Sequence, residues 1–227
     1  MMNTITPSTF SELIRKRKSI RQFQSTPVPE HVLHEALEDA QYAPSNCNTQ
    51  PWHVHIVSGA KKDELSQALL HDVVQGHASP DFEFDFNLYH GRYAQRQIEQ
   101  VTLFYQSLGI TREDREQRQR ALTHNFEFYD APHVAFLFMP SFGDNVRVAS
   151  DVGMYGQSLL LALAARGIGS IPQTSIAMYA DTVRRVLNVP QELKLLFGIS
   201  FGYADEEQPV NQSHIGRDPV KDAVTFH

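Results

Sequence analysis

At 227 residues, with 41% hydrophobic and 20% charged residues, the chain has the composition of one globular domain spanning residues 1–227. Its formal net charge of −6 argues against nucleic acid or an anionic membrane as the main partner. No apolar run approaches the roughly 20 residues that a transmembrane helix needs, and the first ten residues lack a signal-peptide pattern. The single cysteine, Cys47, excludes an internal disulfide, so we expect a soluble cytoplasmic protein.

The first part of the chain alternates helical and strand patterns. Ser8 or Thr9 can cap a first helix, and Pro44 stops the second one. From Trp52 onwards apolar and polar residues alternate, which is typical of a strand. The expected elements are a helix over residues 8–18, a helix starting at Pro29–Glu30, a strand over 52–57 and a helix over 61–74.

The second part is less regular. Residues 76–91 mix Gly, Pro and Asp with aromatic residues and are expected to form a loop or lid. Its aromatic stretch, 82–89, is either a wall for a flat substrate or core filler. The tail from Gln208 ends in a strand-like stretch, 223–226, which suggests that the tail reaches across to another surface. The other expected elements are helices over 92–108, 112–126, 148–166 and 180–187, and strands over 134–139, 169–171 and 195–203.

The first candidate site is a basic run at the end of the first helix. Lys and Arg at a helix C-terminus usually serve only to offset the helix dipole. Here Ser19 and Arg21 continue the run of Arg17 and Lys18 past the helix, alternating around the apolar Ile20. A guanidinium and a hydroxyl on the same side are what a phosphate monoester needs. The segment therefore indicates either phosphate binding or a solvated helix end.

The second candidate site is the connection 43–52, which contains two prolines, two asparagines, a serine and a glutamine. Its donors and acceptors do not titrate near neutral pH, so they suit a polar, neutral, planar ligand better than acid/base chemistry. Asn46 and Asn48 could simply form an Asx turn, but the density of amides makes that interpretation insufficient. Cys47 could be a nucleophile, although the sequence assigns it no base.

The third candidate site is the stretch 167–175, in which a short strand leads into Pro172, Gln173 and Thr174. A strand end after a proline can present backbone N–H groups to the edge of a ligand. Taken alone this signal is weak, since glycine-rich turns between a helix and a strand are common.

Metal and nucleotide motifs are missing from the sequence. The pairs His31/His34 and His53/His55 have no third ligand at a zinc-site spacing, so no metal is expected. The chain has no GxGxxG, no Walker loop and no Gly-x-Ser-x-Gly elbow, which disfavours a Rossmann dinucleotide site, a nucleoside triphosphatase and an α/β-hydrolase.

Together, and in this order, these segments resemble the FMN-dependent nitroreductase family. The matching stretches are residues 17–23, 43–52, 167–173 and the C-terminal segment 211–226, in which Arg217 precedes Pro219. The second stretch is the most specific. Residues 125–132, with the long insertion before them, look like the branch that acts on nitroaromatic acids such as nitrobenzoate.

The resemblance implies an α+β fold with a central, mainly antiparallel sheet surrounded by helices. It also implies a homodimer, with a C-terminal extension reaching the partner and two FMN molecules at the interface. The flavin phosphate and pyrimidine edge would be held by Arg17, Lys18, Ser19 and Arg21, with Arg217 returning to the phosphate. The second subunit would supply Pro44, Ser45, Asn46 and Asn48, and the flavin N5 would lie near Pro172, Gln173 and Thr174.

Two positions depart from the pattern or cannot be aligned. His214 stands where the family often has a second Arg or Lys, so phosphate affinity could be weaker or depend on pH. Arg96 is a further candidate flavin contact that cannot be aligned securely.

The resemblance further implies that the flavin carries the hydride and that no side chain acts as a catalytic nucleophile. The expected function is NAD(P)H-dependent reduction of small nitroaromatic or quinone-type substrates by a ping-pong mechanism. Two alternatives stay open. One is a flavin enzyme of the same fold that performs oxidative dehydrogenation, dehalogenation or flavin fragmentation, and the other is a flavin-binding protein without turnover.

Overall fold

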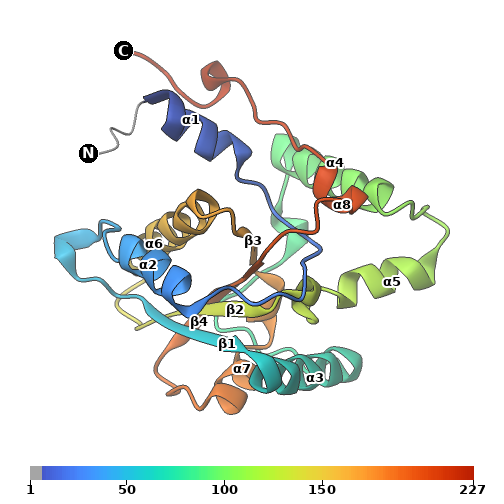
Figure 1. Cartoon of the computed structure of the whole chain (residues 1–227), viewed down its shortest axis with the longest axis horizontal. Helices are drawn as coiled ribbons and strands as arrows, with labels where there is room; N and C mark the ends of the chain where they lie inside the picture. The colour runs from blue at the N-terminus through green and yellow to red at the C-terminus, as the bar shows by residue number, and fades with distance from the viewer. Residues whose placement is uncertain (1–6) are drawn as a thin grey trace.

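The computed structural model describes residues 7–227 (Figure 1). Its main helices are α1 Pro7–Lys16, α2 Glu30–Ala40, α3 Gly59–Gln75, α4 Gly91–Ser107, α5 Arg115–Thr123, α6 Val146–Ala165, α7 Ala180–Leu187 and α8 Pro209–Gln212. Its strands are β1 His53–Ser58, β2 His133–Met139, β3 Gly169–Gln173 and β4 Lys194–Gly202. Most of these elements lie where the hydrophobic periodicity of the sequence predicts them.

The four strands form one antiparallel sheet with the order β1-β2-β4-β3. The central strand β2 is buried along its whole length, which explains why its sequence is almost continuously apolar. The register pairs Val134 with Ser200 on β4 and with Val57 on β1. The expected α+β fold with a mainly antiparallel sheet is confirmed.

Helices cover both faces of the sheet (Figure 1). On one face α2 and α6 bury an apolar cluster that includes Tyr155, Leu159 and Leu163. On the other face α3 and α7 bury a second cluster, which includes Leu65 and Val183. Helices α4 and α5 lie outside these layers, and α4 runs beside α8. Both faces of the sheet are therefore covered by helices, and α4, α5 and both chain ends lie outside this layered core.

Helix α6 is the central helix of the first cluster. Contrary to the expectation from the sequence, its length and composition alone would allow it to cross a membrane, the only such helix among residues 7–227. Half of its most apolar window is buried within the protein, as in the core helix of a folded domain. Gly156 faces the sheet, since a Cβ there would lie 2.7 Å from the Phe197 ring.

Two expected elements differ in the structure. The pattern over 112–126 yields a shorter α5, because Asp114 accepts hydrogen bonds from the backbone N–H and the hydroxyl of Thr111 and so forms a turn before the helix. The expected strand over 223–226 is wrong for this single chain. These residues follow a 3₁₀ turn at Val220–Asp222 and are exposed without strand structure, since no other strand of the described chain lies alongside them to pair with.

A buried histidine joins the sheet to the segment before α2. The Nε2 atom of His133 accepts a hydrogen bond from the backbone N–H of Val28 at 2.9 Å, and its ring stacks on Phe201. Because a backbone N–H can only donate, Nε2 must be unprotonated in this contact. Burial, and then the nearby Lys62 ammonium, lower the pKa of His133 below its ordinary value of 6.5.

This contact gives the first prediction. A folded-state pKa below the unfolded one means that the unfolded chain binds the proton first, so the stabilisation from neutral His133 is present above about pH 6.5 and is lost as the pH falls below it. His133→Leu should lower the free energy of unfolding by about 1–3 kcal/mol at neutral pH, because the Val28 N–H loses its acceptor. It should also flatten the fall in stability below pH 6.5. Urea unfolding at several pH values measures both effects. The exposed His31→Leu variant is the control, and equal pH profiles for His133→Leu and the wild type would contradict the prediction.

Candidate functional site

The basic segment leaves α1 and runs beside β3 like an additional short strand. The backbone N–H of Ile20 donates to the Ser170 carbonyl at 3.1 Å, and Ser19 forms a parallel bridge with Ser170. Ile20 is buried at this junction. A Cβ at Gly169 would lie 2.8 Å from the Ile20 side chain, so glycine is required for this close approach. The alternation of the sequence around Ile20 therefore reflects a real edge of the sheet.

Two arginines from opposite ends of the chain come close together here. Burial, and then the charge of Arg217, lower the pKa of Arg17. Arg217 also donates to the carbonyl groups of Ile215 and Gly216. Within residues 7–227, neither Arg17 nor Arg217 has a carboxylate at ion-pair distance; the arginines that do are Arg96, Arg166, Arg184 and Arg185. Two neighbouring cations without an acidic partner are an arrangement that an anion would stabilise.

The other two basic side chains of the segment already have contacts. Lys18 donates to the backbone carbonyl of Asn211. The guanidinium of Arg21 lies 5.3 Å from the centre of the Phe104 ring on α4, and its charge lowers the pKa of the Tyr129 phenol against the larger effect of burial. Arg21 is thus partly engaged by aromatic residues, whereas Lys18 keeps two N–H groups for a ligand.

Asn211 holds the basic segment in place, and the sequence analysis did not single it out. Its Oδ1 accepts from the backbone N–H of Arg21, and its Nδ2 donates to the carbonyl groups of Gln22 and Asp205, each at 2.8 Å. Only 1% of the residue is exposed. One amide in a polar tail gives no sequence signal, because two of its three partners, Arg21 and Gln22, lie about 190 residues earlier in the chain.

The amide-rich connection between α2 and β1 is a loop with a defined, partly left-handed backbone. Cys47, Asn48 and Gln50 have positive φ values of 51°, 55° and 47°. Asn46 donates its backbone N–H to both carboxylate oxygens of Asp151 on α6 at 3.1 Å, and the Ser45 hydroxyl accepts from the Gln50 N–H. The loop is thus fixed by backbone contacts.

The polar side chains of the loop point mostly toward solvent. Pro44, Asn46 and Asn48 are exposed, and Ser45 is half-buried. Within residues 7–227, no side-chain amide of Asn46 or Asn48 accepts a backbone N–H, so the Asx-turn interpretation lacks its defining bond. The Asn46 amide oxygen accepts from the Cys47 thiol at 3.7 Å, and both exposed amides keep donors for a ligand.

At the end of β3 the three predicted residues differ in exposure. Pro172 and Thr174 are exposed, whereas the side chain of Gln173 is buried. Its amide accepts from the Ser200 hydroxyl and donates to the Asn125 carbonyl. The Gln173 side chain is therefore engaged inside the protein, and its predicted place near the flavin N5 stays a prediction.

The loop and the basic segment lie at opposite ends of α6. The loop is tied to Asp151, and the basic segment to Ser170, just after the helix ends at Ala165. Over this stretch the helix rises by about 21 Å, at about 1.5 Å per residue. Figure 1 shows the loop at one edge of the molecule and the basic segment beside α8, on the other side of α6. One chain therefore does not bring the two groups of residues together.

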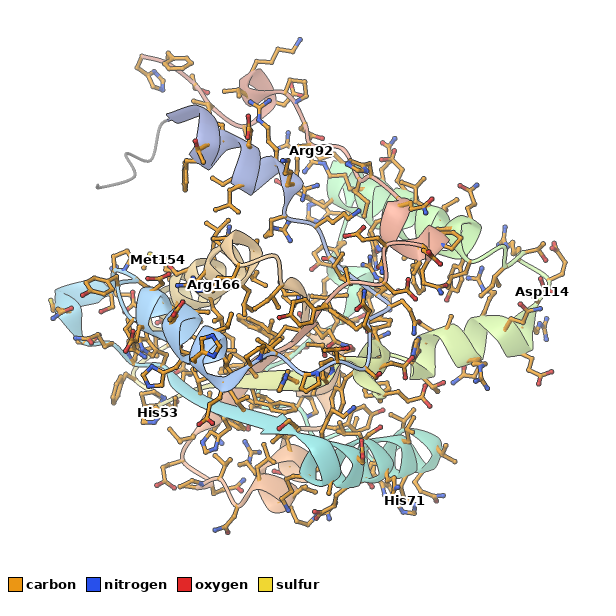
Figure 2. All side chains as sticks on the ribbon, viewed as in Figure 1. His53, His71, Arg92, Asp114, Met154 and Arg166 are labelled. Carbon is orange, nitrogen blue, oxygen red and sulfur yellow. The ribbon has the colours of Figure 1, made fainter. Side chains whose placement is uncertain are left out.

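The remaining candidates lie around the C-terminal segment. His214 and Arg217 are exposed. Arg96 pairs with the carboxylate of Asp218, and Arg92 donates to the Asp222 carbonyl at 2.9 Å. Figure 2 shows Arg92 on α4, beside the C-terminal segment. These two arginines of α4 hold the segment that carries Arg217. Arg96 is thus paired with a carboxylate of its own chain, and its predicted contact with the flavin stays a prediction.

The stretch 76–91 is tied down at its start and exposed at its end. Asp81 is buried in an ion pair with Arg184, at 2.5 Å, and accepts from the Leu195 N–H. Phe82 packs against the core, whereas Phe86 and Tyr89 are exposed. Core filler is therefore the better description of Phe82, and the exposed aromatics remain candidates for a substrate wall. Within residues 7–227, no group of three or more His, Cys, Asp or Glu side chains could hold a metal ion.

Comparison with known proteins shows to which family the chain is related. The family model described as Nitroreductase family matches residues 14–203. Nitroreductase NfnB of Mycolicibacterium smegmatis is 42% identical over 214 residues, covering 94% of this chain and 91% of its own. A 4-nitrobenzoate reductase of Pseudomonas putida is 32% identical, covering 96% and 95%. The crystal structure of FMN-dependent NfnB from Mycobacterium smegmatis in complex with NADPH superposes with a TM-score of 0.92 at 41% identity, covering 96% of this chain and 97% of that one. The chain therefore belongs to the nitroreductase family.

Proposed function

We propose that this protein is a cytoplasmic FMN-dependent reductase that takes electrons from NAD(P)H and reduces nitroaromatic or quinone-type substrates by a ping-pong mechanism. The names of its relatives, which include an NADPH complex of an FMN-dependent nitroreductase, support this proposal. The observation that carries it is the pair Arg17 and Arg217, two neighbouring cations without an acidic partner in residues 7–227.

The basic segment fits the phosphate of FMN. A phosphate monoester carries close to two negative charges and three acceptor oxygens at neutral pH. Arg17 and Arg217 would supply guanidinium donors, and the half-buried Lys18 and Ser19 would supply an ammonium and a hydroxyl. The exposed His214 lies three residues before Arg217 and would add positive charge only when protonated.

The bound flavin would supply hydride acceptance and release, a chemistry that protein side chains lack. The chain would hold the isoalloxazine edge at the end of β3, near Gln173, where Pro172 and Thr174 are exposed. The free ammonium protons of Lys18 would stabilise negative charge that develops on the ring system.

The separation along α6 supports a homodimer in which each site takes residues from both subunits. One chain holds its amide loop about 21 Å of helix away from its own basic segment. A second copy would bring its Pro44, Ser45, Asn46 and Asn48 to the flavin. It would also cover exposed apolar side chains, such as Phe10 on α1 and Phe226 in the tail, which are 49% and 88% exposed.

The reductase function is tested in one cuvette. The purified protein should be yellow, lose its flavin absorbance under anaerobic NADPH or NADH, and regain it when 4-nitrobenzoate is added. A flavin that binds but is not reduced would point to the alternative flavin chemistries or to a binding role. Colourless protein that cannot be loaded with FMN would contradict the proposal.

The phosphate site is tested by the double variant Arg17→Met with Arg217→Met. The loss of two charge-assisted contacts should weaken FMN binding by about ten- to a hundredfold, measured by quenching of flavin fluorescence. Arg15→Met removes an exposed charge from the last turn of α1, two residues before Arg17, and should leave the Kd unchanged. An unchanged Kd in the double variant would show that the phosphate lies elsewhere.

Asn211→Ala should lower both stability and flavin affinity. Because Asn211 is buried, the variant leaves the Arg21 N–H and two carbonyl groups without their partner, at a cost of about 1–3 kcal/mol in the free energy of unfolding. The basic segment should also loosen and raise the Kd for FMN. Urea unfolding and flavin titration measure the two effects. Gln212→Ala, at the exposed neighbouring position, is the control; if the two variants behave alike, Asn211 does not position the segment.

The shared site is tested by complementation. One subunit carries the Arg17 and Arg217 changes, and the other carries Asn46→Ala with Asn48→Ala. If each site uses both subunits, a mixed dimer keeps one intact site, so co-expression of two inactive chains should restore roughly a quarter of wild-type activity. Recovery should disappear when the same two proteins are mixed under conditions that prevent subunit exchange. Full inactivity of the co-expressed pair would argue for a site within one chain.

A further inference from the structure

An acidic residue stands beside the proposed phosphate site. Asp218 directly follows Arg217 in the chain, and Arg217 lies close enough to Arg17 for its charge to lower the pKa of Arg17, after the larger effect of burial. A carboxylate next to two guanidinium groups pairs with them and repels a phosphate. Phosphate binding at this place therefore requires that the Asp218 carboxylate be kept away from both arginines.

The backbone directs the side chains of Arg217 and Asp218 apart. Pro219 follows Asp218 and is itself extended, with a φ of −59° and a ψ of 148°. A residue that precedes a proline is restricted to extended conformations. Along an extended chain, successive side chains point away from each other. Asp218 can therefore face a different partner from the one that Arg217 faces.

That partner is a cation on α4. The carboxylate of Asp218 forms an ion pair with the guanidinium of Arg96, and the two side chains are 41% and 42% exposed. One turn earlier on α4, Arg92 donates to the Asp222 carbonyl at 2.9 Å, and Figure 2 shows Arg92 beside the C-terminal segment. Helix α4 thus holds this segment at two points, and one of them is the carboxylate next to Arg217.

The stability of α4 itself does not explain these two arginines. An ion pair as exposed as that of Arg96 and Asp218 is screened by water and contributes little to folding. Arg92 stands in the first turn of α4, where the helix dipole disfavours a cation, and residues 91–94 include no acidic residue to offset it. What the two arginines have in common is their contact with the C-terminal segment.

We propose that Arg96 is a positioning residue for FMN: it neutralises the Asp218 carboxylate and holds it on α4, which leaves Arg17 and Arg217 to the phosphate. This rests on the proposed function in one respect, the placement of the phosphate at these two arginines. It differs from a direct contact between Arg96 and the flavin, because Arg96 acts only through Asp218.

The test compares FMN with riboflavin, which has the same ring and ribityl chain without the phosphate. Each is titrated into the flavin-free, full-length protein and followed by fluorescence quenching. Arg96→Met releases the carboxylate toward Arg217, so the Kd for FMN should rise about three- to tenfold while the Kd for riboflavin stays unchanged. Lys221→Met removes an exposed charge from the same segment and leaves the Arg96–Asp218 pair intact, so it should match the wild type.

The deciding variant is Asp218→Asn, which removes the charge that Arg96 holds. Alone it should leave the Kd for FMN unchanged or lower it, and combined with Arg96→Met it should restore the wild-type Kd. An ion pair that only fastens the segment would be broken by either change, so weaker FMN binding in Asp218→Asn would overturn the proposal. A direct contact between Arg96 and the flavin would also overturn it, and would show as a loss that Asp218→Asn does not restore.

Failure of the proposed function has a different signature. Wild-type protein that binds FMN no more tightly than riboflavin, or binds neither, would overturn both the phosphate site and the role of Arg96. If FMN binds more tightly than riboflavin and the double variant Arg17→Met with Arg217→Met removes that difference, the phosphate site stands. An unchanged Kd for FMN in Arg96→Met would then overturn the role of Arg96 alone.

Discussion

The docking of residues 17–23 against β3 is the constraint on which the candidate site depends. It places the N-terminal cations beside the edge strand β3. The side chain of Asn211, from the other end of the chain, holds the segment there by hydrogen bonds to the backbone of Arg21 and Gln22. Glycine at position 169 permits the approach, and buried Ile20 fixes its register. Arg17 and Arg217 are neighbours only because these backbone contacts bring the two chain ends to one place.

The periodicity of the sequence predicts most of the helices and strands, because their buried faces repeat at helical or strand spacing. It also identifies the basic segment, the amide loop and the end of β3 as sites of interest. It does not show where these sites lie relative to one another. That depends on α6, whose length separates the loop at Asp151 from the segment at Ser170.

The features that the sequence does not reveal depend on contacts between residues far apart in the chain, or on a partner strand that the single chain lacks. Asn211 looks like any polar tail residue until its partners near position 21 are known. Gln173 looks like an exposed strand end, yet its amide is buried between Ser200 and Asn125. The tail 223–226 has strand composition, but composition alone cannot supply the second strand that a ladder needs. The turn at Asp114 takes up the first residues of the stretch 112–126, where the pattern predicts helix.

The residues of the amide loop with positive φ values affect the entropy cost of binding a ligand there. A non-glycine residue at positive φ costs roughly 1–2 kcal/mol, and the loop contains three of them, Cys47, Asn48 and Gln50. Contacts with Asp151 and the stacking of Trp52 on Tyr155 offset that cost while the chain folds. The loop is thus preorganised: its conformational entropy is already lost in the free protein, and an incoming ring would meet amides whose backbone needs no further ordering.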